Sequence, residues 1–145
     1  MSIDAPAVAR VLGGERVLRR RVRTLDDLRQ AVEAGLPVAA LDAVVYGLAG
    51  EGAVAVELKH RIVPRTTLQR RRSRLSPEES QHLERLARLT ALAEHVWEDG
   101  DLAREFLTGV QPQLGGKRPV DLVSSDLGTR QVEDLLFALE YSLPI

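Results

Sequence analysis

The chain has 145 residues, of which 44% are apolar and 28% charged, so it can bury one core or two very small ones. It has no cysteine, which excludes a disulfide framework and thiolate chemistry and fits a reducing cytoplasm. No apolar run reaches membrane-spanning length and the N-terminus lacks the apolar stretch of a signal peptide, so we expect a cytoplasmic protein that does not bind membranes.

The two halves of the chain carry opposite charge. Residues 1–75 contain 14 Arg and Lys against 8 Asp and Glu, whereas residues 76–145 contain 6 against 13. The resulting charges of +6 and −7 give the net charge of −1. This polarity indicates two modules with different partners, the first of them a polyanion.

Residues 1–23 have no clear pattern and are interpreted as an N-terminal arm. The run 16–23 is compatible with a short strand or with an irregular segment. Its arginines, from Arg19 to Arg23, either reach a nucleic acid or form a solvated tail, and the pattern does not choose between these.

Two helices are predicted next. Thr24 is a suitable N-cap, with acidic residues in the first turn, and Gly35 is a natural stop. Pro37 opens a second helix that ends in the glycines 47, 50 and 52. Its apolar side consists of Leu41, Val44, Val45 and Leu48.

The segment 53–63 allows two interpretations. Val54, Val56 and Leu58 alternate with other residues, which alone indicates a strand. Because Pro64 and a basic helix follow directly, the segment also fits the positioning helix of a helix-turn-helix.

A densely basic helix is predicted from Pro64 to Leu75, with Leu68 and Leu75 on one apolar face. No acidic residue occurs between Glu57 and Glu78, whereas a merely solvated helix usually mixes charges. Arginine suits guanine edges and phosphates, Gln suits adenine, and hydroxyl groups suit phosphate oxygens. We therefore favour nucleic acid over a solvated face. The predicted DNA-binding residues are Arg65, Thr66, Thr67, Gln69, Arg70, Arg71, Ser73 and Arg74.

A long amphipathic helix should start at Ser76, where Ser76 and Glu79 form a capping box, and end near Gly100. Leu92 lies among its polar residues and is expected at the surface. Its apolar stripe comprises Leu83, Leu86, Leu89, Thr90, Ala93 and Trp97.

Beyond it we expect a short helix capped by Asp101, a loop over 110–119, one turn within 119–127, and a last helix over 129–144. Phe137 and Tyr141 lie four residues apart, away from the core stripe of the last helix. They either form an interface or are covered by another helix of the chain.

No residue pattern indicates catalysis. The histidines at 60, 82 and 95 have no Cys partners and no HExxH spacing, so no metal site is predicted. Gly115-Gly116-Lys117-Arg118 lacks the first glycine and the hydroxyl residue of a phosphate-binding loop, and is interpreted as a tight turn. We expect no enzyme, no cofactor and no catalytic residue.

Several segments resemble the Xre/MbcA/ParS antitoxin family over about residues 11–145. Thr67-Leu68-Gln69-Arg70-Arg71 and Arg74-Leu75-Ser76-Pro77-Glu78-Glu79-Ser80 are similar to its junction motif. In this sequence His60-Arg61-Ile62-Val63 stands where the family usually has a Gly in the turn, and an Arg with positive φ would be strained. The other matching residues are Gly35-Leu36-Pro37, Ala40-Leu41, Ala103, Phe106-Leu107, Leu114-Gly115-Gly116, Pro119, Leu122, Gly128, Val132 and Leu135-Leu136.

The resemblance implies an all-α protein with an Xre-like helix-turn-helix DNA-binding domain at 24–75 and a small helical toxin-binding domain at 76–145. It implies an antitoxin of a type II toxin-antitoxin module that covers the NAD pocket of a RES-domain, NAD-consuming toxin with its C-terminal segment. It also implies a homodimer that represses its own operon by binding operator DNA. The residues expected on the toxin are Phe137, Tyr141, Ser142, Leu143, Pro144 and Ile145.

Other functions remain open at the sequence level. The chain also fits a stand-alone helix-turn-helix transcriptional regulator whose acidic domain dimerises or senses a ligand. A third possibility is a protein inhibitor that has lost DNA binding through the altered turn at Arg61, and an unrecognised enzyme is a remote fourth.

Overall fold

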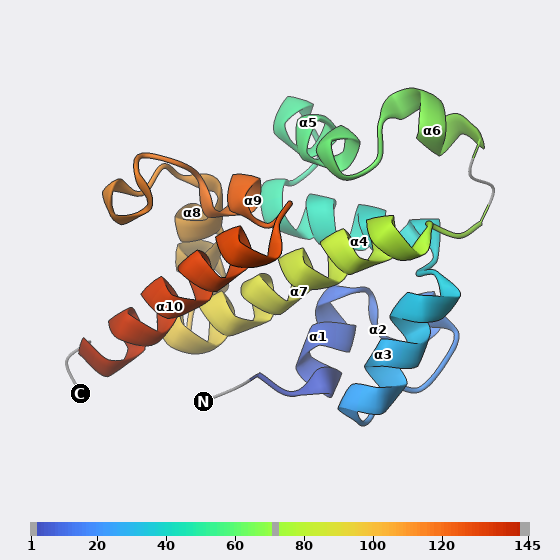
Figure 1. Cartoon of the computed structure of the whole chain (residues 1–145), viewed down its shortest axis with the longest axis horizontal. Helices are drawn as coiled ribbons and strands as arrows, with labels where there is room; N and C mark the ends of the chain where they lie inside the picture. Colours follow the sequence, from blue (N-terminus) through green and yellow to red (C-terminus); the bar gives the residue numbers. More distant parts are fainter. Residues whose placement is uncertain (1–2, 71–72, 143–145) are drawn as a thin grey trace.

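The computed structural model describes residues 3–70 and 73–142, and within these ranges the chain forms α-helices and no β-strand. The predicted all-α fold class is thereby confirmed (Figure 1). The α-helices are α1 (Ala5–Val11), α2 (Gly14–Leu18), α3 (Leu25–Ala34), α4 (Val38–Ala49), α5 (Ala53–Ile62), α6 (Arg65–Arg70), α7 (Pro77–Trp97), α8 (Gly100–Thr108), α9 (Pro119–Leu122) and α10 (Asp126–Ser142), and η1 (Pro112–Leu114) is a 3₁₀ turn.

The central element is α7, which runs through the middle of the bundle (Figure 1). Its 21 residues span about 30 Å, and it packs against α1, α3 and α4 as well as α8 and α10. The predicted capping box fixes its start: Ser76 Oγ accepts the Glu79 N–H at 3.1 Å, and the Glu79 carboxylate accepts the Ser76 N–H at 2.8 Å.

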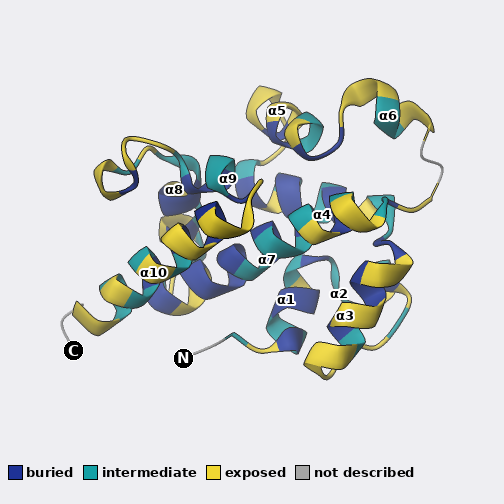
Figure 2. Cartoon of the chain, in the orientation of Figure 1, coloured by how far each residue is buried: buried dark blue, intermediate teal, exposed yellow. Residues whose placement is uncertain are grey.

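One hydrophobic core extends through the molecule. A single cluster of buried side chains runs from Ala5 in α1 to Leu136 in α10, and the buried faces of the helices point inward around α7 (Figure 2). Residues on both sides of the predicted domain boundary at 75/76 therefore share this core. The boundary itself stays a prediction.

Residues 5–18 fold into two helices rather than a strand or an arm. Asp4 caps α1 by accepting the Ala7 N–H at 2.9 Å, and a proline stands in its first turn. Val8 and Leu12 are fully buried against the rest of the core. Ala5, Val8, Ala9 and Leu12 follow the i, i+3, i+4, i+7 pattern, which is the sequence signal for this helix.

The ambiguous segment 53–63 is helical, so the strand interpretation was wrong. Ala55, Leu58 and Ile62 are buried at helical spacing, whereas Val54 and Val56 are exposed.

The starts of two later helices also differ from prediction. Asp99, not Asp101, caps α8 by accepting the Leu102 N–H at 2.9 Å, and α10 begins at Asp126.

Within the described residues, no helix combines the length and apolar character needed to cross a bilayer.

Candidate functional site

The basic helix α6 stands on the outside of the bundle and contributes no buried residue (Figure 2). Leu68 is half-buried and packs against the core cluster, so it holds the inner side of the helix. The side chains of Arg65, Thr66, Gln69 and Arg70 are exposed. Thr67 is half-buried.

The exposed arginines of α6 are not neutralised by the protein. Neither Arg65 nor Arg70 forms an ion pair with a carboxylate among the described residues. The segment between Glu57 and Glu78 has no acidic side chain that could pair locally. Uncompensated guanidinium groups on a protruding element suit the phosphates and base edges of DNA.

The predicted basic helix ends earlier than expected. The described part of α6 ends at Arg70, and residues 73–75 lie extended against the loop between α3 and α4 rather than in the helix. Val38 N–H donates to Ser73 O at 2.9 Å, and Leu75 N–H donates to Leu36 O at 2.8 Å. This non-local pairing overrides helix propensity, because it buries Leu75 while satisfying the backbone on both sides.

Two of the predicted DNA-binding residues therefore lie off the helix. Ser73 and Arg74 are exposed in the extended segment, and the Arg74 guanidinium donates to Gly35 O at 2.8 Å. Arg71 lies outside the described residues. Gly35 itself must lack a side chain: its φ is +92°, and a Cβ there would approach Leu75 O to 2.5 Å.

The turn before α6 is not strained at Arg61. Arg61 lies in the last turn of α5, and among the described non-glycine residues only Arg19 and Glu98 have positive φ. The chain turns instead at Val63 and Pro64, where Val63 is extended. The turn therefore differs from the glycine-containing turn of the resembling family, and Arg61 keeps a helical backbone.

Four charged side chains join α5 to α9. Arg118 donates to Glu57 at 2.7 Å and to Asp121 at 2.8 Å, and Arg61 donates to Asp121 at 2.6 Å. The Arg118 hydrogen bonds lower the pKa of Asp121, although partial burial acts against them, and nearby Arg61 lowers it further. We call these four residues the α5–α9 ion-pair cluster. It attaches the helix before α6 to the acidic half of the chain.

The last described turn of α10 reaches the edge of the molecule (Figure 1). Tyr141 is 76% exposed there, and Ser142 is exposed with its hydroxyl donating to Ala138 O at 2.8 Å. Phe137 is half-buried and packs against the core, so the two aromatic side chains do not form one exposed pair. Leu143, Pro144 and Ile145 lie outside the described residues.

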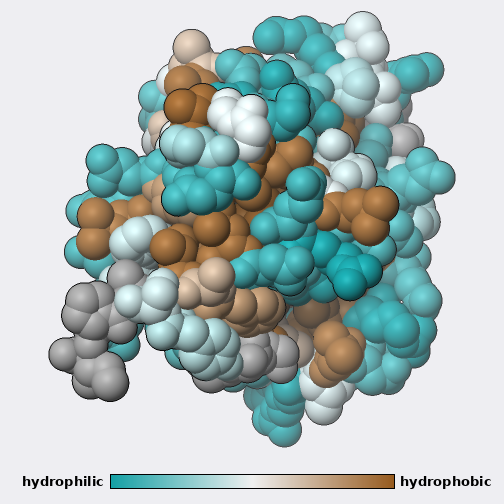
Figure 3. Space-filling view, turned by 60° about the vertical axis from the view of Figure 1, so that its left-hand side comes forward, coloured by the Kyte–Doolittle hydropathy of each residue, from teal (hydrophilic) through white to brown (hydrophobic). Residues whose placement is uncertain are grey.

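Further apolar side chains are exposed in the acidic half. The view toward the C-terminal side shows hydrophobic residues among polar ones (Figure 3). The exposed residues are Leu102 in α8, Val110 after it, and Leu127 in α10. The sequence did not predict their exposure, because single residues in loops and at helix ends give no periodic pattern.

Leu92, expected at the surface, is buried. It lines a cavity together with Ile3, Ala5 and Phe137, so the N-terminal segment and α10 cover this side of α7.

Within the described residues, no group of three or more His, Asp or Glu side chains is arranged to hold a metal ion.

Comparison with known proteins gives two matches. Residues 92–141 match the family model of the antitoxin Xre/MbcA/ParS C-terminal toxin-binding domain. The chain is also 32% identical over 84 residues to a protein named Antitoxin Xre from Pseudomonas putida strain KT2440, and this alignment covers 56% of the chain and 53% of that protein. The chain thus spans about half the length of the curated relative that it matches.

Proposed function

Because the chain belongs to the Xre/MbcA/ParS-type antitoxins through its C-terminal toxin-binding domain, we propose that it neutralises a partner toxin and binds the DNA of its own promoter. The observation that carries the proposal is the combination, in one molecule, of a toxin-binding domain at 92–141 with the unneutralised basic helix α6.

The proposed toxin is a RES-domain protein that consumes NAD, and the C-terminal segment covers its NAD pocket. Tyr141 supports this assignment, because it projects from the last described turn of α10 near the chain end. A pocket that accepts the phosphates of NAD needs a positive opening. The charge of −7 over residues 76–145 would steer this half toward it.

Substitution of Tyr141 tests the toxin contact. Tyr141→Ala should weaken binding of the toxin by about tenfold or more, since exposed tyrosines that become buried in an interface are frequent binding hot spots. The measurement is growth rescue, with titration of the purified pair, using the product of the neighbouring reading frame as toxin.

Leu25→Ala is the matched control, because Leu25 is also 76% exposed but lies in the basic half. It should leave neutralisation unchanged. A chain truncated after Glu140 that still neutralises the toxin fully would contradict the proposed role of the C-terminal segment.

The proposed DNA element is α6, acting in a homodimer on the operator of its own operon. Replacing both Arg65 and Arg70 by Ala should weaken operator binding and reduce the slope of log K against log salt by about 0.9 for each phosphate that the variant no longer binds. Arg130→Ala, which removes an exposed arginine from α10, is the control. Equal binding by the double variant and the wild type would exclude α6 as the DNA-binding element.

The neighbouring gene separates this proposal from a stand-alone transcriptional regulator. A RES-type reading frame beside the gene supports the antitoxin, whereas a metabolic operon supports the regulator.

A further inference from the structure

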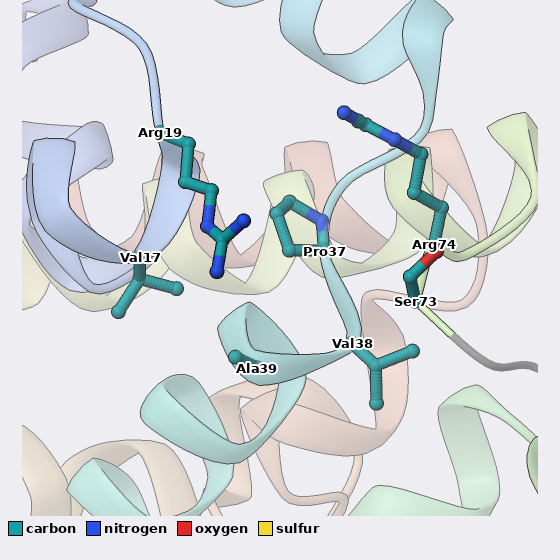
Figure 4. A pocket seen from close by; sticks show the side chains of 7 residues that line it. All are labelled: Val17, Arg19, Pro37, Val38, Ala39, Ser73 and Arg74. Carbon is teal, nitrogen blue, oxygen red and sulfur yellow. The ribbon is translucent and has the colours of Figure 1, made fainter.

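A cavity of about 430 Å³ opens where the end of α2, the start of α4 and the segment 73–75 meet. Arg19 lies on one side of Pro37 and Arg74 on the other (Figure 4). Val17 and Val38 provide apolar lining. The cavity thus brings together two arginines that are 55 positions apart in the chain.

The charge of this cavity is uncompensated. None of its lining residues is acidic. Arg19 forms no ion pair among the described residues, and Arg74 donates to the backbone oxygen of Gly35 rather than to a carboxylate. Glu15, the acidic residue of α2, instead faces Arg21 at 3.7 Å. The lining therefore includes two arginines, one on each side of Pro37, whose guanidinium groups are not paired with carboxylates.

Arg19 occupies a conformation in which arginine is unfavourable. It is the C-cap of α2 in the left-handed region, with φ 55° and ψ 32°. Glycine is the usual residue at such a position, and the chain does use glycine at its neighbouring positive-φ positions 13, 14 and 35. A side chain kept at a local cost in stability is a reason to look for a function of that side chain.

The cavity borders the basic helix. Arg70 is the last described residue of α6 and Ser73 lines the cavity, so the Cα atoms of these two residues are at most about 11 Å apart. Phosphates follow one another along each DNA strand with an axial rise of about 3.4 Å. A duplex held by α6 would therefore present its backbone to the cavity.

We propose that Arg19 and Arg74 together bind a backbone phosphate of the DNA duplex that α6 contacts. This inference rests on the proposed DNA binding and adds to it a second contact, supplied by the N-terminal segment. Phosphate contacts carry no sequence information, so Arg19 adds affinity and fixes the orientation of the protein on any duplex.

The test uses the full chain and a short duplex of random sequence, with affinity measured from about 50 to 200 mM salt. The variant is Arg19→Gly, which removes the guanidinium and relieves the left-handed backbone. It should bind about fivefold to tenfold more weakly at about 0.1 M salt, with the salt slope reduced by about 0.9. Its melting temperature should be at least as high as that of the wild type, which separates weaker binding from impaired folding.

Arg19→Lys keeps the charge and should retain the salt slope, while Arg130→Ala removes a remote charge and should change neither slope nor affinity. The effect of Arg19→Gly should be the same on the operator duplex. A wild-type slope for Arg19→Gly, or an equal loss of affinity for Arg130→Ala, would overturn this inference alone. Absence of DNA binding by the wild type would overturn both this inference and the proposed DNA-binding function.

Discussion

His82 illustrates how burial at a single position sets the response to pH. Burial in α7 lowers its pKa from 6.5 to about 4, and nearby Arg85 adds to the effect. The unfolded chain therefore takes up a proton at a pH where the folded chain does not. The contribution of His82 to the free energy of unfolding is fully present above about pH 6.5. It is lost as the pH drops toward 4, which lowers the unfolding free energy by up to about 3 kcal/mol.

His82→Gln removes this titration. The variant should lose less stability than the wild type between pH 6.5 and pH 4, because Gln needs no proton in either state. Urea unfolding at several pH values measures this. The His82 assignment would be contradicted if both proteins lost stability in parallel across that range.

Ser80 is a buried polar residue that joins two halves of the chain. Its hydroxyl accepts the Leu36 N–H at 2.8 Å, and both residues are fully buried. Ser80→Ala leaves this N–H without a partner, so we expect a decrease of about 1–3 kcal/mol in unfolding free energy. Ser73→Ala, at an exposed position nearby, should cost much less, and calorimetry compares the two.

The sequence predicts helix caps, which depend on nearby residues, better than it predicts contacts between distant segments. The capping boxes at Thr24 and Ser76 depend on residues three positions apart, and Thr24 and Ser76 cap their helices as predicted. The bond from Leu36 to Ser80 spans 44 positions and leaves no local signal. Leu92 was misjudged for the same reason, since the segments that cover it come from both ends of the chain.

Among the helices, α5 is held on two sides. It packs against α4 through apolar residues and is joined to α9 by the ion-pair cluster of Glu57, Arg61, Arg118 and Asp121. Helical periodicity predicted most helices, including α3, α4 and α7. It did not predict that residues 73–75 lie off the helix, because Ser73 and Leu75 pair with the loop between α3 and α4 instead of forming helical hydrogen bonds.

Removing Arg118 should loosen α5. Arg118→Ala breaks bonds to Glu57 and Asp121, and because both partners are partly exposed we expect a modest decrease of about 1 kcal/mol in stability. Amide hydrogen exchange should speed up in α5 more than in α3. Lys117→Ala changes a neighbouring exposed charge and is the control. Unchanged exchange in α5 after Arg118→Ala would show that the ion-pair cluster does not hold this helix.

For the whole molecule, the continuous core around α7 predicts cooperative unfolding. Trp97, the only tryptophan, lies at the end of α7 and packs near Phe106, with ring centroids 6.1 Å apart. Its fluorescence reports the acidic half, whereas far-ultraviolet circular dichroism reports all helices. The two transitions should coincide. A circular dichroism transition that precedes the fluorescence change would instead indicate two independent domains.

The proposed division of the chain into a DNA-binding half and a toxin-binding half also concerns the whole molecule. The charge pattern and the order of motifs were sufficient to propose a DNA-binding half and a toxin-binding half. The fold adds that these halves share one core and are joined by charged contacts between α5 and α9. Such sharing depends on tertiary packing, so composition and periodicity could not reveal it.

The central claim is that the end of α10 contacts a toxin while α6 contacts DNA. Amide hydrogen exchange tests it most directly, on the full chain alone, with the purified product of the neighbouring reading frame, and with DNA of its own promoter. We predict that the toxin protects the C-terminal turns of α10 and leaves α6 unchanged, while DNA protects α6 and leaves the end of α10 unchanged. Protection of α6 by the toxin, without protection at Tyr141, would contradict the account.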